Sequence, residues 1–277
     1  MATTPPTTTT PAPARDPLPI LLYHSVSDDP PPWIAPFTVS PRAFAEHLDL
    51  VVASGRVPVT ARQVVDAVRG GPPLPPAAVL ITFDDGFADF VEFAQPALRA
   101  RGLPAALFVT TGSLGPVNRS LLPPAEMMSL RQVVAAAREG VEIGAHSHTH
   151  PQLDTVPRAA AQSELARSRA TLEDALGEPV TLFAYPHGYS DATVRNLARR
   201  TGYTGAFAVR NALSSAADDP FGIARLTVRA DTAAAQVAHW LRGEGTRVAP
   251  YPESAATKLW RVYRRGRAVL HARSTRP

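Results

Sequence analysis

The stretch Val79-Leu80-Ile81-Thr82-Phe83-Asp84-Asp85-Gly86 decides how the rest of the chain is interpreted. It begins as a continuous apolar run rich in β-branched residues, which predicts a short strand buried on both faces, as in a parallel sheet. The run ends in two adjacent carboxylates, which are costly to bury unless a cation or hydrogen-bond donors receive them. Two interpretations stay open from this stretch alone. One acid could bind a metal while the other acts as a base, or the pair could form an Asp-Asp-Gly turn that caps the next helix.

Short apolar runs that predict strands alternate with amphipathic stretches that predict helices. The strand candidates are residues 19–26, 79–83, 105–110, 141–145 and 181–185, with later ones at 205–209 and 223–228. Such alternation is typical of βαβ units around a parallel sheet. The 277 residues can bury one large core, and the number of strand candidates suits a closed or nearly closed barrel. We therefore predict an α/β barrel.

The chain divides into three expected segments. Residues 1–17 are rich in Thr and Pro and predict a disordered tail, residues 18–250 form the barrel domain, and residues 251–277 form a basic C-terminal tail or helix. Within the barrel domain, residues 87–101 predict a helix that Pro96 kinks or splits.

Polar side chains that could carry chemistry follow four of the predicted strands. They are His24, the pair Asp84-Asp85, the cluster His146-Ser147-His148-Thr149-His150, and the segment Tyr185-Pro186-His187-Gly188. In a parallel α/β barrel the carboxyl ends of the strands meet at one rim, where active sites form. We expect the four groups to converge there, which favours a functional site over a simple turn at the two aspartates.

A metal centre is the interpretation that best accounts for this set. The chain contains no cysteine, so the ligands of any metal must be His and carboxylate side chains. His146 and His150 have the spacing of one helical turn or a tight loop, and Asp85 adds a carboxylate. Two His and one carboxylate leave coordination positions open, as catalytic metal sites do. His148 is an alternative to either histidine.

The two strongest motifs resemble those of a known family. Thr82-Phe83-Asp84-Asp85 and His146-Ser147-x-x-His150 are similar to the first two motifs of the polysaccharide deacetylases, the NodB-homology group or carbohydrate esterase family four. The resemblance covers residues 18–241. Leu22-Tyr23-His24-Ser25-Val26 resembles the branch of bacterial exopolysaccharide N-deacetylases that carry a Tyr-His-x-Val motif near the start. This resemblance implies a distorted (β/α)7 barrel.

The resemblance also implies a role for each matching residue. Asp84 would be the general base and His24 the general acid. The backbone N–H of His187 would help to hold the oxyanion of the tetrahedral intermediate. One divalent metal, for which zinc is the expected ion, would be bound by Asp85, His146 and His150.

Two positions depart from the family pattern. The third motif would be Arg-x-Pro-Tyr-Gly, and Ala184 stands where its arginine is expected. In the family this arginine orients the base and keeps it ionised; Arg225, in a late strand candidate, could supply the same charge. His187 replaces the tyrosine of the motif, which keeps the backbone donor but changes the side chain that faces the substrate.

The resemblance predicts a metal-dependent hydrolase that removes the acetyl group from an N-acetylated sugar, such as an N-acetylglucosamine-type glycan, glycolipid or sugar precursor. Two alternatives stay open. The chain could be a metal-dependent amidohydrolase acting on a non-sugar linear amide, or an inactive carbohydrate-binding relative, which only the missing arginine suggests.

Charge and composition bear on partners and location. The net charge is +4, and part of the basic excess lies in residues 251–277, where Trp260 and Tyr263 stand among arginines. This segment could be a solvated tail or an amphipathic helix that lies on an acidic surface or an anionic membrane. No nucleic-acid-binding motif accompanies it, so we expect no nucleic-acid partner. Residues 1–14 lack the basic and apolar regions of a signal peptide, and we expect a cytoplasmic protein that could associate peripherally with a membrane.

Overall fold

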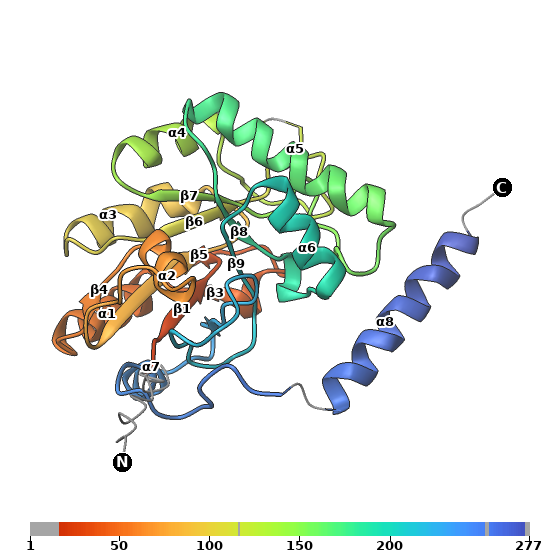
Figure 1. Ribbon diagram of the computed structural model, residues 1–277. Coiled ribbons are helices and arrows are strands. Elements are labelled where there is room, and N and C mark those ends of the chain that lie inside the picture. Colours follow the sequence, from red (N-terminus) through yellow and green to blue (C-terminus); the bar gives the residue numbers. More distant parts are fainter. Residues whose placement is uncertain (1–16, 116, 253–254, 275–277) are drawn as a thin grey trace, which may run out of the picture.

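The computed structural model describes residues 17–115, 117–252 and 255–274, and its centre is a curled sheet of parallel strands (Figure 1). Across the sheet the strands follow in the order β10 (Leu226–Thr227), β1 (Ile20–Tyr23), β5 (Ala78–Phe83), β6 (Ala106–Val109), β7 (Glu142–Ala145), β8 (Leu182–Ala184) and β9 (Gly205–Phe207). An isolated parallel bridge between Phe207 and Ile223 links β9 to the segment before β10, so the two edges approach each other. This curled parallel sheet confirms the predicted α/β fold of the distorted-barrel type.

Three further strands lie off this path. The short β4 (Val57–Pro58) pairs with the beginning of β5, and β2 (Ser25–Val26) and β3 (Thr38–Val39) form a separate two-stranded sheet. In the two-stranded sheet, β2 follows β1 after one residue, His24, so this sheet lies close to that side chain.

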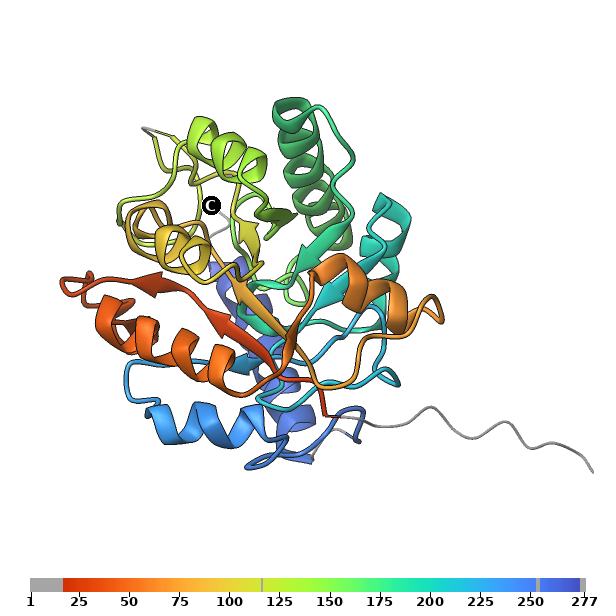
Figure 2. The same ribbon diagram turned by 90° about the vertical axis from the view of Figure 1, so that its left-hand side faces the viewer.

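Helices surround the sheet (Figure 2). They are α1 (Pro41–Ala53), α2 (Ala61–Val68), α3 (Gln95–Arg99), α4 (Leu130–Arg138), α5 (Arg158–Leu176), α6 (Ala192–Thr201), α7 (Ala234–Leu241) and α8 (Ala255–Ser274). Pro96 splits the helix predicted over residues 87–101: a π-helical turn at Phe90–Ala94 runs into α3, and Pro96 lies in the first turn of α3, where a missing N–H is tolerated.

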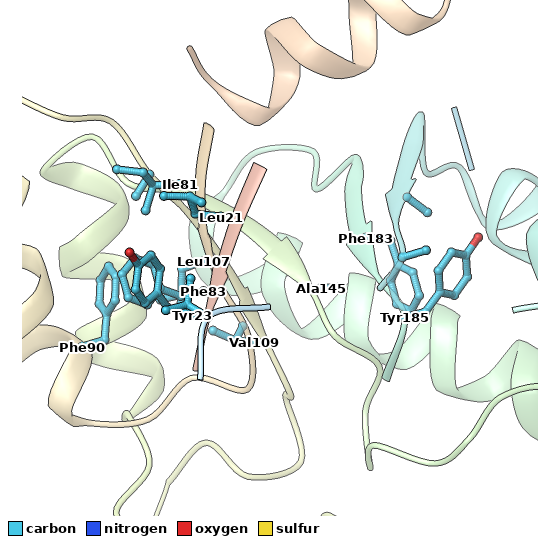
Figure 3. Packing of buried hydrophobic residues seen from close by; sticks show 14 of the residues in the cluster. Leu21, Tyr23, Ile81, Phe83, Phe90, Leu107, Val109, Ala145, Phe183 and Tyr185 are labelled. Carbon is cyan, nitrogen blue, oxygen red and sulfur yellow. The ribbon is translucent and has the colours of Figure 1, made fainter. Parts of the chain in front are cut away.

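The strands carry apolar side chains on both faces, which explains their continuous apolar runs. Alternate residues form an inner cluster that includes Ile20, Leu80 and Phe108, and α2 packs against the same cluster. The residues between them, such as Tyr23 and Phe83, point the other way. Figure 3 shows these two rings beside Phe90, Leu21 and Ile81 in the outer cluster, which the surrounding helices cover.

This alternation determines the direction in which the Asp84 side chain leaves the end of β5. Leu80 and Thr82 face the inside of the barrel, and residue 84 continues that register, so the Asp84 carboxylate enters the top of the barrel interior. Ile81 and Phe83 face outward, and Asp85 would follow them if the strand continued. The strand ends at Phe83, and the turn after it brings Asp85 back to the rim.

The C-terminal helix α8 does not cover the sheet. In Figure 1 its ribbon lies beyond α6, and in the turned view of Figure 2 it passes behind the strands. Arg264 on α8 donates to both carboxylate oxygens of Asp154, at 3.0 and 2.8 Å, and Arg265 pairs with Asp191 at the start of α6. Helix α8 is therefore attached to the loops that follow β7 and β8.

Two statements concern the ends of the chain. The tail predicted to be disordered at residues 1–17 lies, up to residue 16, outside the described residues. In the part of the chain that the structure describes, no helix has both the length and the apolar character needed to cross a membrane.

Candidate metal centre and active site

The residues predicted to form the site converge on one cavity at the carboxyl ends of the strands. The cavity has a volume of about 680 Å³. It is lined by six of the seven predicted site residues, His24, Asp84, Asp85, His146, His150 and His187; the seventh, Arg225, is not among its lining residues. These six residues come from the ends of β1, β5, β7 and β8, so the parallel order of the sheet assembles them from positions up to 163 residues apart.

Asp85, His146 and His150 form a group that could hold a metal ion. One potential ligand atom from each lies within 4.8 Å of the others. Asp85 Oδ1 is 3.5 Å from His146 Nε2 and 3.2 Å from His150 Nε2. Nδ1 of His146 donates to the Ala184 carbonyl at 2.9 Å, which leaves Nε2 to face the group as the acceptor nitrogen.

The Asp85 carboxylate fits a cation on two grounds. Its Oδ1 is buried and makes no hydrogen bond with the described residues, so its lone pairs are available to an ion. Burial alone would raise the pKa of Asp85, but His150 and His146 hold it well below its ordinary range, so the carboxylate is charged. Burial lowers the pKa of His146 to about 4, which leaves its ring neutral, as a metal ligand must be.

The loop that carries the two histidines is held by groups outside the ligand set. Glu164 on α5 accepts the backbone N–H groups of His148, at 2.9 Å, and Thr149, at 2.6 Å. The Ser147 hydroxyl accepts the N–H of His150 at 2.9 Å. The His148 side chain bonds to the Thr111 hydroxyl at 2.9 Å and is not in the ligand group, so it is not the alternative ligand that its sequence position allowed.

Backbone strain is concentrated at this rim. Six described residues other than glycine have positive φ, and five of them line or adjoin the cavity; these five are Asp85, Ser147, His150, His187 and Asn211. Such conformations cost on the order of 1 kcal/mol each and persist where the surrounding structure enforces them. The strain is thus located where side chains must be aimed at one point rather than spread along the strands.

Asp84 is held by a buried arginine. Nη1 and Nη2 of Arg225 each donate to one Asp84 oxygen at 2.7 Å, and the Arg225 side chain is fully buried. The guanidinium lies over the neighbouring rings of Phe108 and Phe207, 5.6 and 5.9 Å from their centroids. Burial would raise the pKa of Asp84, but Arg225 and then His146 hold it below its ordinary value. The Asp84 carboxylate also lies next to the group that could hold a metal ion, with its Oδ2 3.8 Å from His146 Nε2.

His24 faces the same cavity from the end of β1. Its Nδ1 is buried and has no hydrogen-bond partner among the described residues, and its ring lies 5.4 Å from that of Phe37. Burial lowers the pKa of His24, while the charges of Asp85 and Asp84 oppose the shift. The imidazole is therefore a titratable group with an unpaired nitrogen, in the same cavity as the metal group and on the strand next to β5.

His187 lies next to the metal group on a strained turn. Its ring centroid is 4.7 Å from that of His150, and its φ is +56°. Gly188 follows with φ +73°, and a Cβ there would collide with the side chain and backbone of Val209. The turn after β8 can therefore press against the neighbouring strand end and bring the His187 backbone to the cavity.

Comparison with known proteins identifies the family. Residues 71–206 match the family model described as Polysaccharide deacetylase. The solved structure of IcaB from Ammonifex degensii is similar with a TM-score of 0.72 at 30% sequence identity, over 82% of this chain and 97% of that one. The chain belongs to the polysaccharide deacetylase family.

Two curated proteins are also similar to this chain. Bacillus subtilis YxkH, whose name assigns it to the same family, is 28% identical over 187 residues, 67% of this chain and 62% of that protein. The Escherichia coli K12 poly-beta-1,6-N-acetyl-D-glucosamine N-deacetylase is 36% identical over 83 residues, 30% of this chain and 12% of that enzyme. The chain thus spans less than two thirds of the length of either protein.

Several contacts of the candidate site lie beyond what its motifs predict. The part matched by the family model runs from residue 71 to residue 206, so it contains the metal group but neither His24 nor Arg225. Glu164 and the Arg264–Asp154 pair have no local motif, because each acts on a loop that is distant in sequence. The only signal for them in the sequence is charge: an acid in the first half of a helix, and a cluster of arginines near the C-terminus.

Proposed function

We propose that this protein is a metal-dependent deacetylase that hydrolyses the acetamide of an N-acetylated sugar. The observation that carries this proposal is the buried Asp84–Arg225 pair beside a group of one carboxylate and two histidines. A carboxylate kept ionised next to a metal group is the arrangement needed to take a proton from water. The Escherichia coli relative, by its name, acts on an N-acetylglucosamine polymer, which supports a sugar as the substrate here.

The metal is proposed to be zinc. Asp85, His146 and His150 would bind it through one oxygen and two nitrogens, a donor set that suits zinc and leaves positions open. When bound, such an ion polarises the acetyl carbonyl and lowers the pKa of water. The expected result is about one zinc per chain by elemental analysis of protein expressed without added metal, and its loss in D85N.

The remaining steps belong to side chains and backbone of this chain. Asp84, aligned by Arg225, takes the proton from the attacking water. The His187 N–H donates to the carbonyl oxygen as negative charge develops on it. His24, which lines the same cavity, gives a proton to the departing sugar nitrogen, which is a poor leaving group without it. Acetate and an amino sugar are the products.

Acetate release from N-acetylglucosamine oligomers by zinc-loaded protein tests the proposal. We expect H24A to lower kcat by roughly 10²–10⁴-fold, the usual share of a general acid. His239 on α7 is a matched control, because its side chain is 52% exposed and remote from the cavity, and H239A should be unaffected. No release from a broad panel of N-acetylated sugars would contradict the proposal, and turnover of non-sugar linear amides instead would support the amidohydrolase alternative.

The contact between Arg225 and Asp84 argues against the alternative that the protein is an inactive carbohydrate-binding relative. That alternative rested on Ala184, which stands in place of the family arginine. Arg225 supplies a guanidinium to both oxygens of Asp84 from another strand, so the charge absent from the third motif is present in the site. An active enzyme is therefore the proposal that the geometry supports.

We also propose that α8 makes a peripheral contact with an anionic membrane. Leu259, Val262 and Tyr263 occupy one helical stripe and are 72%, 67% and 54% exposed. Arg264 and Arg265 bind carboxylates of the barrel, so the apolar stripe supports this contact more than the charge of the helix does. Sedimentation with vesicles of anionic lipid should decrease in L259S/V262S. Cell fractionation tests this contact together with the expected cytoplasmic location.

A further inference from the structure

A second cavity lies beside the catalytic one, on the side covered by α8. Its volume is about 570 Å³. The two cavities share four lining residues, Gly188, Tyr189, Val209 and Asn211, so they adjoin at the turn after β8 and the segment after β9. A substrate bound at the metal group could therefore extend into the second cavity.

The second cavity is lined by cationic groups and by no acid among the described residues. Two of its arginines are already paired: Arg195 with Asp219 at 2.7 Å, and Arg264 with Asp154. Arg210 and Arg247 make no ion pair with any residue in the described ranges. Both instead lie within 6.0 Å of the Tyr251 ring, which fixes two guanidinium groups on one aromatic side chain.

A buried donor without a partner lines the same cavity. Arg264 is 8% exposed, and its guanidinium stacks 3.6 Å from the centre of the Tyr189 ring. Both terminal nitrogens are used by Asp154 and Gln152, but Nε is buried and has no hydrogen-bond partner among the described residues. A buried charged donor left unpaired is costly, and an anion that reached it would remove that cost.

We propose that this cavity binds a phosphate group of the substrate whose N-acetylated sugar occupies the catalytic cavity; the inference rests on the proposed function. Guanidinium groups match the geometry of phosphate oxygens, and several arginines with one unpaired buried donor exceed what a neutral sugar needs. The substrate class is thus an N-acetylated sugar that carries a phosphate or diphosphate. The phosphate could belong to a soluble sugar phosphate or to a lipid diphosphate, and the two share the same recognition.

Substrate preference in the zinc-loaded full chain tests the proposal. We compare kcat/KM for N-acetylglucosamine 1-phosphate, for the same sugar on a polyprenyl diphosphate in phosphatidylcholine vesicles, and for the neutral methyl N-acetylglucosaminide. A phosphorylated substrate should be favoured at least about tenfold, which is the low end for one charge-assisted hydrogen bond. This preference should disappear in R210Q/R247Q and persist in R200Q, since Arg200 is exposed on α6 and lines none of the described cavities.

The soluble and vesicle substrates distinguish the source of the phosphate. Preference for the soluble sugar phosphate supports a free metabolite, and preference confined to the vesicle substrate supports a lipid diphosphate. Equal kcat/KM for the phosphorylated and neutral substrates in the wild type would overturn the proposal.

A binding measurement separates this proposal from the catalytic one. Calorimetry with inorganic pyrophosphate should show binding to D85N, which lacks a metal ligand, and at least tenfold weaker binding to R210Q/R247Q. If no N-acetylated sugar is turned over but this pattern is found, the proposed function fails and the phosphate site stands. Pyrophosphate binding that is equal in all three proteins refutes the phosphate site, whatever the activity.

Discussion

Replacing Arg225 by methionine tests the electrostatic arrangement on which the proposed chemistry depends. Methionine keeps an unbranched, apolar side chain inside the barrel but removes both donors to Asp84. The Asp84 carboxylate is only 3% exposed, so solvent cannot replace the lost guanidinium. In the presence of a chelator, no metal can replace it either, and R225M then contains an uncompensated buried charge.

The loss of unfolding free energy in R225M can be worked out in two ways. Breaking a buried pair by removing one partner typically costs about 3–5 kcal/mol of unfolding free energy. The carboxyl can escape by binding a proton, which at pH 7 costs about 4 kcal/mol for a group whose ordinary pKa is about 3.9. The two estimates agree, so we expect R225M to lose about 4 kcal/mol at pH 7.

The sign of the pH dependence is also determined. In the wild type the folded-state pKa of Asp84 is lowered, so its contribution to stability is present above pH 4 and is lost as the pH falls. In R225M the folded-state pKa is raised, so protonation becomes cheaper toward low pH. The difference between the two proteins should therefore shrink to about 1.5 kcal/mol at pH 5.

Urea unfolding of four proteins with chelator, at pH 5 and pH 7, is the assay. They are the wild type, R225M, D84N and D84N/R225M. Because the double variant has neither charge, it should be more stable than the two single losses added together, with a coupling of a few kcal/mol between neighbours in contact. R225K should lie between wild type and R225M, since lysine keeps the charge but not the paired donors. A loss in R225M below about 1 kcal/mol, or one equal at both pH values, would refute the reasoning.

Three other outcomes follow from the described contacts. E164A should weaken zinc binding by about 10–100-fold in a metal titration, because the loop that carries His146 and His150 loses the carboxylate that holds it. E178A, at an exposed position in the loop after α5, should leave zinc binding unchanged. D154N should weaken the anchorage of α8 and increase amide hydrogen exchange along that helix while zinc still binds; unchanged exchange would show that Arg264 does not hold it. Zinc at 100 times its dissociation constant should stabilise the wild type by about 2.7 kcal/mol and D85N by much less, and equal stabilisation would place the metal elsewhere.

Part of the site can be predicted because it is local in the sequence. The apolar run of β5 predicts a buried parallel strand, and alternation along it directs Asp84 into the barrel. The spacing of His146 and His150 brings two imidazoles together whatever the exact turn, and the structure places both with Asp85 in one group. Their roles in catalysis stay predictions that the activity measurements above examine.

Other parts depend on contacts that no local pattern encodes. The motif around Ala184 suggests a base without an arginine, yet Arg225 reaches Asp84 across 141 positions, because β10 lies next to β1 and β1 next to β5. Residues 251–277 alone allow either a solvated tail or a membrane helix. The described helix α8 instead inserts Arg264 against Asp154, and it thereby forms one wall of the arginine-lined cavity.

The sequence by itself determined the strand, the two acids at its end and the histidines that follow another strand, since hydrophobic periodicity and spacing act over a few residues. Only the tertiary structure decided which charge faces Asp84, what anchors the histidine loop and what covers the second cavity. Those choices depend on the order of strands in the sheet and on pairing across the barrel. A buried charge is tolerated only where some other part of the chain brings its partner, and that partner can come from any distance along the sequence.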